Sequence, residues 1–216
     1  MLTVEFHCHT RYSKDSLVYP DALVEACRRK GIDRVVVTDH NEIEGALVAQ
    51  HIDPQRVIVG EEVMTSEGEL LAAFVQERIP PGLAPLEAIN RLRQQGAFIS
   101  VSHPFDRNRS GSWRHEDLVV ILPHIDAIET FNARCLSSSF NRQAQEFASQ
   151  HKLRGTVGSD AHTLRELGRA VLILPEFHDA DSLRLSIIDA QTKTRLSSPF
   201  IHFTSRWAVW NKKAWR

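Results

Sequence analysis

The sequence has few cysteines, no excess of charge of either sign and no long apolar run. Its 216 residues include only three cysteines, an odd number without zinc-finger spacing, so we expect no disulfide framework and a reducing compartment. The 26 basic side chains nearly balance the 27 acidic ones and give a net charge of -1, which excludes a global attraction to nucleic acid or membranes. Any binding of a polyanion must therefore come from a local basic patch.

Targeting and membrane signals are also missing. No apolar run approaches the length that spans a membrane, and the N-terminus enters an apolar strand pattern without a charged and apolar leader. We find no internal repeat, low-complexity tract or linker. We therefore expect a cytoplasmic protein with one domain over residues 1–216, no contact with membranes and no obligate protein partner.

Short apolar runs rich in β-branched residues alternate with amphipathic segments, which indicates an α/β fold. The pattern predicts strands over 2–9, 34–38, 57–59, 70–75, 98–101, 127–130, 154–157 and 170–174, and helices over 22–30, 43–50, 84–95, 115–122, 139–151 and 180–190. The first βαβ unit implies a parallel pair of strands, whereas a turn at Glu67 and Gly68 predicts a hairpin within residues 57–75. Residues 106–113 are rich in arginine and glycine and are expected to form a loop.

Two histidines separated by one residue end the first apolar run. Because side chains alternate along a strand, His7 and His9 face the same side and can reach one ion, while Cys8 turns away into the core. Such a pair alone is as often an accident as a site. However, further residues of the same kind follow the other apolar runs: Asp39, His40, Glu62, His103, Asp160 and His162. Since catalytic groups collect at strand ends in a parallel β/α barrel, this convergence predicts a metal site.

Each residue also has a simpler interpretation. Asp15 could cap a turn or the helix that follows it, and His40 could lie in a loop without a function. A buried Asp160 could pair with a nearby arginine. The metal site therefore depends on the joint occurrence of these residues.

Five motifs occur in an order that resembles the PHP (polymerase and histidinol phosphatase) family. They are His7-Cys8-His9 with Tyr12-Ser13-x-Asp15, Thr38-Asp39-His40-Asn41, Gly60-Glu61-Glu62, Ser102-His103-Pro104 and Gly158-Ser159-Asp160-Ala161-His162. The resemblance extends from residue 5 to about residue 175. It implies a distorted, TIM-like (β/α)7 barrel with two or three metal ions at the C-terminal ends of its strands, and hydrolysis of phosphate esters.

The resemblance also implies a set of metal ligands. One ion would bind His7, His9, Glu62 and Asp160, a second would share Glu62 and add His103, and a third would bind Asp15, His40 and His162. Glu61 competes with Glu62 for the bridging position, because only one of them can face the ions in a regular strand. The family pattern favours Glu62. Many relatives have a histidine where this chain has Glu69, which still offers an oxygen ligand to the second ion.

Mixed imidazole and carboxylate ligands suit Zn, Mn or Fe rather than Ca. Clustered divalent ions orient a phosphoryl group and lower the pKa of a bridging water, so a metal-bound hydroxide is the implied nucleophile. No protein nucleophile is needed, and Ser159 is interpreted as a turn residue. The leading hypothesis is thus a phosphoesterase acting on a small phosphorylated metabolite or a nucleotide. The alternatives are an exonuclease or RNA end-processing enzyme, and a metal-binding module without catalysis.

Candidate substrate contacts follow two of the predicted strands. Arg107 and Arg109 lie in the loop after His103, and Arg134 and Asn132 follow the strand at 127–130. Arginine binds phosphate in a bidentate geometry, but these arginines are as easily explained as solvated surface residues.

The C-terminal tail, residues 203–216, carries tryptophans among basic residues. These residues are Trp207, Trp210, Trp215, Arg206, Lys212, Lys213 and Arg216. Such a segment could stack nucleic-acid bases and contact phosphates. The favoured interpretation is that the tryptophans pack against the body of the protein and the charges are solvated.

Overall fold

A computed structural model describes residues 1–214 of the chain. Its strands are β1 (Leu2–Cys8), β2 (Arg34–Val37), β3 (Val57–Met64), β4 (Glu69–Ala73), β5 (Phe98–Val101), β6 (Ala127–Asn132), β7 (Arg154–Gly158), β8 (Ala170–Leu174) and β9 (Gln191–Thr194). Its helices are α1 (Pro20–Lys30), α2 (Glu44–Ile52), α3 (Pro85–Gln94), α4 (His115–Ile121), α5 (Ser138–Gln150), α6 (Ala180–Ser186) and α7 (Ile201–Ala214).

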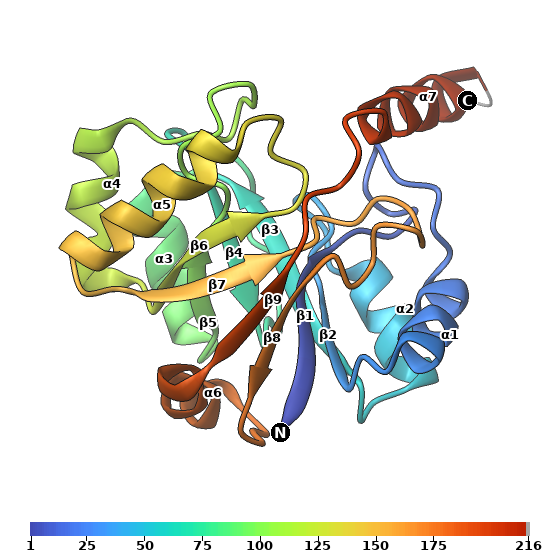
Figure 1. Cartoon of the computed structure of the whole chain (residues 1–216), viewed down its shortest axis with the longest axis horizontal. Coiled ribbons are helices and arrows are strands. Elements are labelled where there is room, and N and C mark those ends of the chain that lie inside the picture. The colour runs from blue at the N-terminus through green and yellow to red at the C-terminus, as the bar shows by residue number, and fades with distance from the viewer. Residues whose placement is uncertain (215–216) are drawn as a thin grey trace.

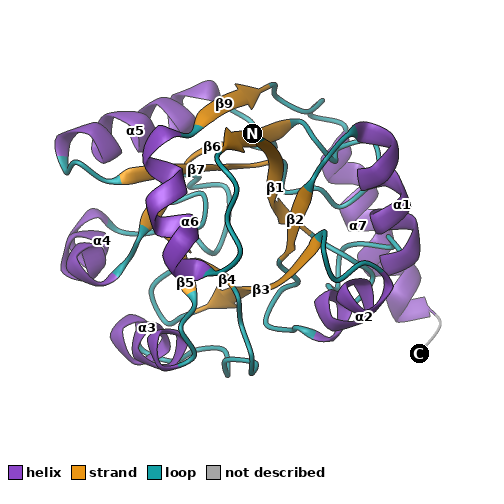
Figure 2. Ribbon diagram, turned by 90° about the horizontal axis from the view of Figure 1, so that it is seen from below, coloured by secondary structure: helices purple, strands orange, loops and turns teal. Residues whose placement is uncertain are grey.

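The strands form one sheet that curls into a nearly closed barrel. Their order is β7-β6-β5-β4-β3-β2-β1-β8-β9, and α1 to α5 lie outside the barrel wall (Figure 1, Figure 2). An isolated parallel bridge between Cys8 and Ala161 joins the ends of β1 and β7, where the His9 amide donates to the Ala161 carbonyl at 2.8 Å. The distorted, TIM-like α/β barrel expected from the sequence is thereby confirmed.

β4 runs against both of its neighbours in the barrel wall, and β8 runs antiparallel to β1. β4 pairs antiparallel with both β3 and β5, which confirms the hairpin predicted within residues 57–75. Because its direction is reversed, β4 begins at the end of the barrel where the parallel strands finish. Glu69, the first residue of β4, is therefore carried to the same end as the residues that follow the parallel strands.

Three elements near the C-terminus differ from the sequence prediction: α6, β9 and α7, the last of which lies where only a tail was expected. The helix expected over residues 180–190 ends at Ser186 and continues as a short 3-10 turn over Ile187–Asp189. β9, which was not predicted, pairs antiparallel with the outer edge of β8. Its sequence, Gln-Thr-Lys-Thr, is entirely exposed and has no apolar face, so it carries no period-two signal.

The lower half of the barrel interior is apolar. Phe6 and Phe98 pack edge to face with ring centroids 5.6 Å apart, and Phe177, Leu183 and Ile187 belong to the same buried cluster. α6 therefore covers the lower mouth of the barrel (Figure 2). Phe6 belongs to this cluster, whereas its neighbour His7 reaches the polar upper end. A register shift between Glu5 and Cys8 allows the two adjacent residues to do so.

The expectation that the tail packs its tryptophans against the body is wrong for the two tryptophans that can be assessed. α7 projects from the upper rim of the barrel (Figure 1), and Trp207 and Trp210 remain 55% and 66% exposed. Trp215 and Arg216 lie outside the described residues. Among those residues, no helix is both long and apolar enough to cross a membrane.

Candidate metal centre

Four of the expected ligands meet directly above the apolar core. The Nε2 atoms of His7 and His9 lie 3.1 Å apart, and each is 3.3 to 3.4 Å from Glu62 Oε2. Asp160 Oδ1 lies 3.3 Å from His9 Nε2 and 3.7 Å from His7 Nε2. Two ligand atoms that bind one ion at about 2.1 Å are separated by roughly 3.0 to 3.4 Å, so this group has the dimensions of a coordination sphere.

A second group lies beside the first and shares Glu62 with it. His103 Nε2 is 3.1 Å from Glu62 Oε1 and 3.4 Å from Glu69 Oε2. His40 Nδ1 is 2.9 Å from Glu62 Oε2 and 3.7 Å from Glu69 Oε1. Glu62 thus lies between the two groups, and Glu69 closes the second one.

A third group stands nearest to solvent. Asp15 Oδ2 is 3.1 Å from His162 Nε2 and 3.6 Å from His40 Nε2. His9, His40 and His162 can also offer three nitrogens that lie within 4.8 Å of one another. The structure therefore brings together all nine residues that the sequence singled out as ligands, and it places His9 and His40 at the junctions between groups.

Several atoms in this cluster are buried and make no hydrogen bond. They are Asp15 Oδ1, Glu62 Oε2, His103 Nδ1, Asp160 Oδ1 and His162 Nε2. A buried polar atom without a partner costs about 1 to 3 kcal/mol, and more if the group is charged. Three of these atoms, Glu62 Oε2, Asp160 Oδ1 and His162 Nε2, face other ligand atoms of the cluster, so divalent cations would satisfy them together.

The carboxylates of the cluster favour positive charge on the groups beside them. Burial opposes ionisation of His7, but Glu62, Asp160 and Glu129 raise its pKa well above the usual range. Burial alone would raise the pKa of Glu62, yet His7 and His40 hold that pKa well below the usual range. The two effects have one origin, because each group is charged most easily when its neighbour carries the opposite charge.

The pKa values of His9 and Glu69 shift in the opposite directions to those of His7 and Glu62. Burial, together with His162 and His40, lowers the pKa of His9 well below the usual range. Burial, together with the charge on Glu62, raises the pKa of Glu69. His9 is thus held in the neutral form that metal ligation requires, and Glu69 faces an anionic neighbour that a cation would neutralise.

Glu62, rather than Glu61, faces the cluster. The side chain of Glu61 points away from it and accepts a hydrogen bond from the Ile79 amide at 3.0 Å. Burial raises the pKa of Glu61 to about 7. The two neighbours on β3 therefore follow the alternation expected of a strand.

Glu129 is the main residue of the site that the sequence analysis missed. Its Oε1 lies 3.0 Å from His7 Nδ1, and its Oε2 accepts hydrogen bonds from the His103 amide at 2.8 Å and from Asn132 Nδ2 at 3.1 Å. A carboxylate on the far nitrogen of a ligating imidazole orients the ring and raises its basicity. A glutamate inside the apolar run at 127–130 was the signal that could have indicated it.

Ser13 and Asp39 support the other histidines in a similar way. Ser13 Oγ lies 3.0 Å from His9 Nδ1 and accepts from the His40 amide at 3.0 Å. Asp39 accepts hydrogen bonds from the Ser13 hydroxyl at 2.7 Å and from the Thr10 amide at 2.7 Å. Asp39 therefore holds the loop after β1 and does not reach the ligand cluster itself.

The backbone conformation at the end of β7 also helps to position the ligands and the residues that support them. Asp160 has a φ of 51°, a left-handed conformation that is uncommon for residues other than glycine. A Cβ at Gly158 would lie 2.4 Å from Glu129 Oε1 and 2.4 Å from His7 Cβ. The motif from Gly158 to His162 thus turns sharply and lets Glu129 approach His7.

The candidate substrate residues have different environments. A pocket of about 530 Å³ opens onto the outer ligands Asp15, His40, Glu69 and His162, and both Arg109 and Arg134 line it. Arg109 forms an ion pair with Asp160 and a second with Asp106, whose Oδ2 lies 3.1 Å from Arg109 Nε. Despite burial, Asp160 raises the pKa of Arg109 above the usual range.

Arg134 and Asn132 are engaged with the protein itself. Arg134 Nη1 lies 2.6 Å from His162 Nδ1, and its Nε is 3.1 Å from Glu166 Oε1. Asn132 Nδ2 donates to Asp160 Oδ2 at 3.2 Å as well as to Glu129. Both residues therefore hold ligands in place.

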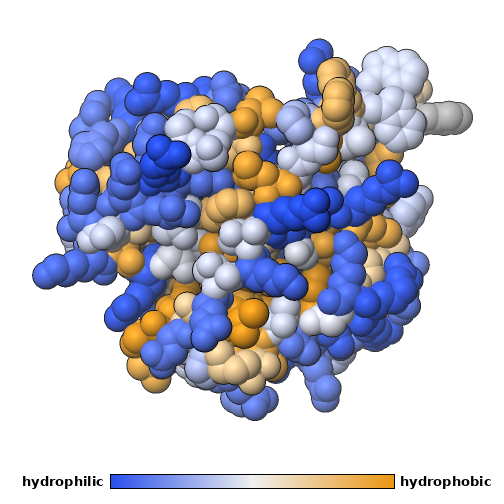
Figure 3. Space-filling model, viewed as in Figure 1, coloured by the Kyte–Doolittle hydropathy of each residue, from blue (hydrophilic) through white to orange (hydrophobic). Residues whose placement is uncertain are grey.

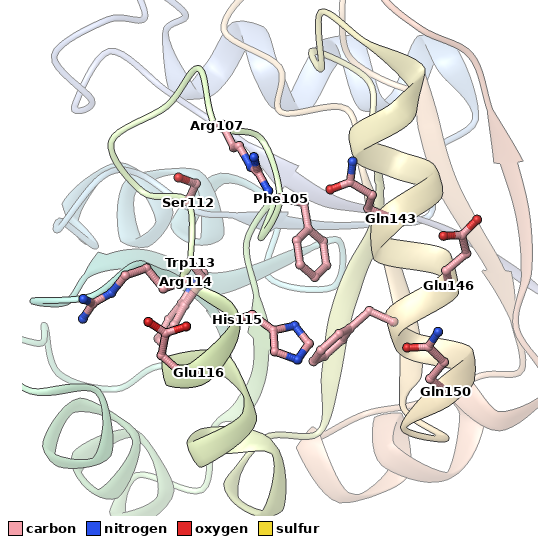
Figure 4. A pocket seen from close by; sticks show the side chains of 11 residues that line it. Phe105, Arg107, Ser112, Trp113, Arg114, His115, Glu116, Gln143, Glu146 and Gln150 are labelled. Carbon is pink, nitrogen blue, oxygen red and sulfur yellow. The ribbon is translucent and has the colours of Figure 1, made fainter.

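Arg107 lies apart from the ligand cluster. It is exposed and lines another pocket of about 570 Å³, next to Phe105 and across from Gln143 of α5 (Figure 4). The loop that carries Arg107 and Arg109 therefore directs only Arg109 toward the ligands.

The fold is a nearly closed α/β barrel, and three adjoining groups of histidine and carboxylate side chains lie at its upper end. Together these two features define the class of the protein as a candidate metal-binding barrel. A family model described as the PHP domain matches residues 5–106, and a second, described as PHP-associated, matches residues 138–192. An uncharacterised protein of Methanocaldococcus jannaschii is 34% identical over 180 residues, which cover 82% of this chain and 72% of the relative. The chain belongs to the PHP family.

Solved structures share the fold at lower sequence identity. PsfC from Pseudomonas syringae superposes with a TM-score of 0.70 at 19% identity, over 98% of both chains. A candidate metal-dependent phosphoesterase from Bifidobacterium adolescentis gives a TM-score of 0.64 at 17% identity, over 86% of this chain and 95% of its own. A lesion-specific endonuclease from Pyrococcus furiosus gives 0.57 at 14% identity, over 88% of this chain and 57% of its own.

Proposed function

We propose that the protein is a metal-dependent phosphoesterase that hydrolyses a phosphate ester in the pocket above the ligand cluster. The observation that carries the proposal is the cluster of nine histidine and carboxylate side chains at the open end of the barrel, in which Glu62 Oε2, Asp160 Oδ1 and His162 Nε2 are buried and make no hydrogen bond. Divalent ions bound there would neutralise phosphoryl oxygens and increase the acidity of water. The phosphoesterase and endonuclease among the structural neighbours support phosphate esters as the substrate class.

The contacts support a particular division of the ligands. The innermost ion would be held by His7, His9, Glu62 and Asp160, since the two histidine nitrogens lie 3.1 Å from each other and 3.3 to 3.7 Å from the carboxylate oxygens. A second would lie between Glu62, Glu69 and His103, with His40 close enough to contribute. A third would be held by Asp15, His40 and His162. Zn, Mn or Fe would suit these ligands.

The residues around the ligands would bind and orient the substrate. Arg109 lies at the wall of the pocket, where its guanidinium is already attracted to Asp160. An arriving phosphate would share this guanidinium and be held close to the ligand cluster. Lys14 lines the same pocket and adds further positive charge for an anionic substrate.

The test is metal analysis by mass spectrometry on protein purified without chelator, together with hydrolysis of an aryl phosphate. We expect two to three equivalents of Zn, Mn or Fe and turnover that is lost after dialysis against chelator and restored by the metal. Metal uptake without turnover on any phosphate ester would favour the binding module without catalysis. Absence of both would refute the proposal.

A further inference from the structure

α7 carries a row of exposed aromatic side chains that no part of the described chain covers. Phe200, Phe203, Trp207 and Trp210 are 75%, 65%, 55% and 66% exposed, and together we call them the aromatic stripe. Their spacing of three, four and three residues places the last three on one face of α7, with Phe200 just before its first turn. Apolar and weakly polar side chains crowd this projecting helix in Figure 3, at the upper right.

The opposite face of α7 is fixed to the rim of the barrel. Ala208 is buried, and the Ser205 hydroxyl accepts a hydrogen bond from Arg134 Nη2 at 2.8 Å. His202 Nε2 lies 3.1 Å from the Arg134 carbonyl, and Lys212 donates to the carbonyls of Arg11 and Ser13. The aromatic stripe therefore stands in a defined position relative to the metal ligands, because Arg134 contacts His162 and Ser13 contacts His9.

The charged side chains that α7 itself carries are of one sign. Residues 190–216 contain no aspartate or glutamate. Arg206 and Lys213 are seven residues apart on the flank of the stripe, and both are exposed. Two copies of α7 packed together would therefore place cations opposite cations without an acidic partner. Charge complementarity favours an anionic partner with flat apolar groups.

The pocket of the metal centre continues onto this helix. His202, Ser205 and Arg206 line it together with Asp15, Glu69 and His162. Arg206 thus stands between the ligand cluster and the aromatic stripe. A ligand that placed one phosphate in the pocket would meet Arg206 with its next phosphate and the aromatic stripe with its bases.

We propose that α7 is a platform for single-stranded nucleic acid, so that the substrate of the metal centre is a phosphodiester or terminal phosphate within such a strand. This inference rests on the proposed phosphoesterase function. Aromatic side chains stack on every base, and cations beside them follow the backbone, so the binding is tolerant of sequence. The local basic patch that polyanion binding requires in a protein of net charge -1 is then supplied by α7.

The test measures the fluorescence anisotropy of a labelled oligothymidylate of about twelve nucleotides, long enough for one binding platform. Phosphorothioate linkages prevent its hydrolysis, and the metal-loaded protein is titrated at about 50 mM and about 200 mM salt. Replacing Trp207 and Trp210 by serine should weaken binding at least about tenfold, since stacking contributes substantially for each base. The matched control is Leu185→Ser, which removes a side chain that is 70% exposed on α6, at the other end of the barrel, and should leave the affinity unchanged.

Charge is tested separately. Arg206→Ala should reduce the slope of the logarithm of affinity against the logarithm of salt concentration by about 0.7, the loss of one contact to a single strand. Arg195→Ala removes an exposed arginine from a groove beside β8 and β9 and should leave the slope unchanged. An equal reduction of the slope in both variants would mean that the oligonucleotide is attracted nonspecifically to basic residues, and would overturn the proposal.

The remaining outcomes separate the inference from the proposed function. Hydrolysis of aryl phosphate by the wild type without oligonucleotide binding would overturn the platform and leave the phosphoesterase intact. A blue shift of the tryptophan emission on adding vesicles of phosphatidylserine, without any binding of the oligonucleotide, would assign α7 to a membrane surface. A dimer in light scattering that dissociates in the double tryptophan variant would assign it to self-association. Oligonucleotide binding without hydrolysis of any phosphate ester would refute the catalytic function instead.

Discussion

The buried carboxylates at the two ends of the barrel have opposite surroundings. At the lower end, Asp126 Oδ2 lies 2.8 Å from Arg93 Nη1, its Oδ1 lies 3.0 Å from Arg184 Nε, and the Ile99 amide donates to it at 2.8 Å. The carboxylate is thus surrounded by protein donors that link α3, β5 and α6. At the upper end, the carboxylates of Asp15, Glu62 and Asp160 each keep one buried oxygen without a hydrogen bond.

The difference separates charges that serve the fold from charges that serve a ligand. Asp126 gains its counter-charges from the chain and is stabilised as soon as the protein folds. The upper carboxylates are stabilised fully only when cations arrive from solution, because the histidines beside them are also the intended ligands. Variants at the two ends should therefore affect different measurements.

The largest effect is expected from His9→Ala at the upper end. His9 contributes to two of the possible ligand groups, so its loss opens both of them. We expect hydrolysis of aryl phosphate to be abolished and metal content to fall, while the circular dichroism spectrum stays that of the wild type. Full activity in this variant would remove His9 from the site. His178→Ala alters an exposed histidine far from the cluster and serves as the control.

Asp126→Asn should reveal the opposite behaviour at the lower end. The variant loses two ion pairs whose arginines are partly exposed, so we expect a loss of about 2 kcal/mol in the free energy of unfolding. Metal content and hydrolysis at permissive temperature should be unchanged. Chemical denaturation and metal analysis check the two expectations, and reduced metal content would show that the ends are coupled.

The pH dependence of this loss has a defined sign. Despite partial burial, Arg93 and Arg184 hold the pKa of Asp126 below its usual range. The stabilisation is therefore complete above the unfolded pKa of about 3.9 and disappears as the pH falls toward the lower, folded value. The difference between wild type and variant should thus be constant near neutrality and shrink below about pH 4.

An intermediate effect is expected from Glu129→Gln. Gln is close to Glu in size but lacks its charge, so it would weaken the hold on His7 and leave the amide of His103 with an acceptor. We expect metal affinity to fall by about 10- to 100-fold, as for other residues behind a ligand. Calorimetric titration of chelator-treated protein with Zn or Mn measures this directly. An unchanged affinity would show that the packing around His7 suffices to orient it.

The upper end was more predictable from the sequence than the lower end. Metal chemistry restricts the residue types, so His7, His9, Glu62, His103, Asp160 and His162 could be selected by type and by their position after apolar runs. Asp126 follows no such pattern, because arginines from any element could have paired with it. Glu129 was missed because the signal for a supporting carboxylate is a single charge in an apolar strand. The exposure of Trp207 and Trp210 could not be predicted either, since aromatic residues usually pack on the body of a protein.

The smallest effect tests how far the upper carboxylates oppose folding without metal. Burial and the charge of Glu62 raise the pKa of Glu69, so its ionised form destabilises the metal-free native state at neutral pH. Glu69→Gln removes this charge and should stabilise the chelator-treated protein by about 1 kcal/mol, whereas the increase in Tm on adding metal should be smaller than in the wild type. Glu67→Gln, at a partly exposed position paired with Arg114, is the matched control. If chelator-treated Glu69→Gln were less stable than the wild type, Glu69 would belong with Asp126 among the charges that serve the fold.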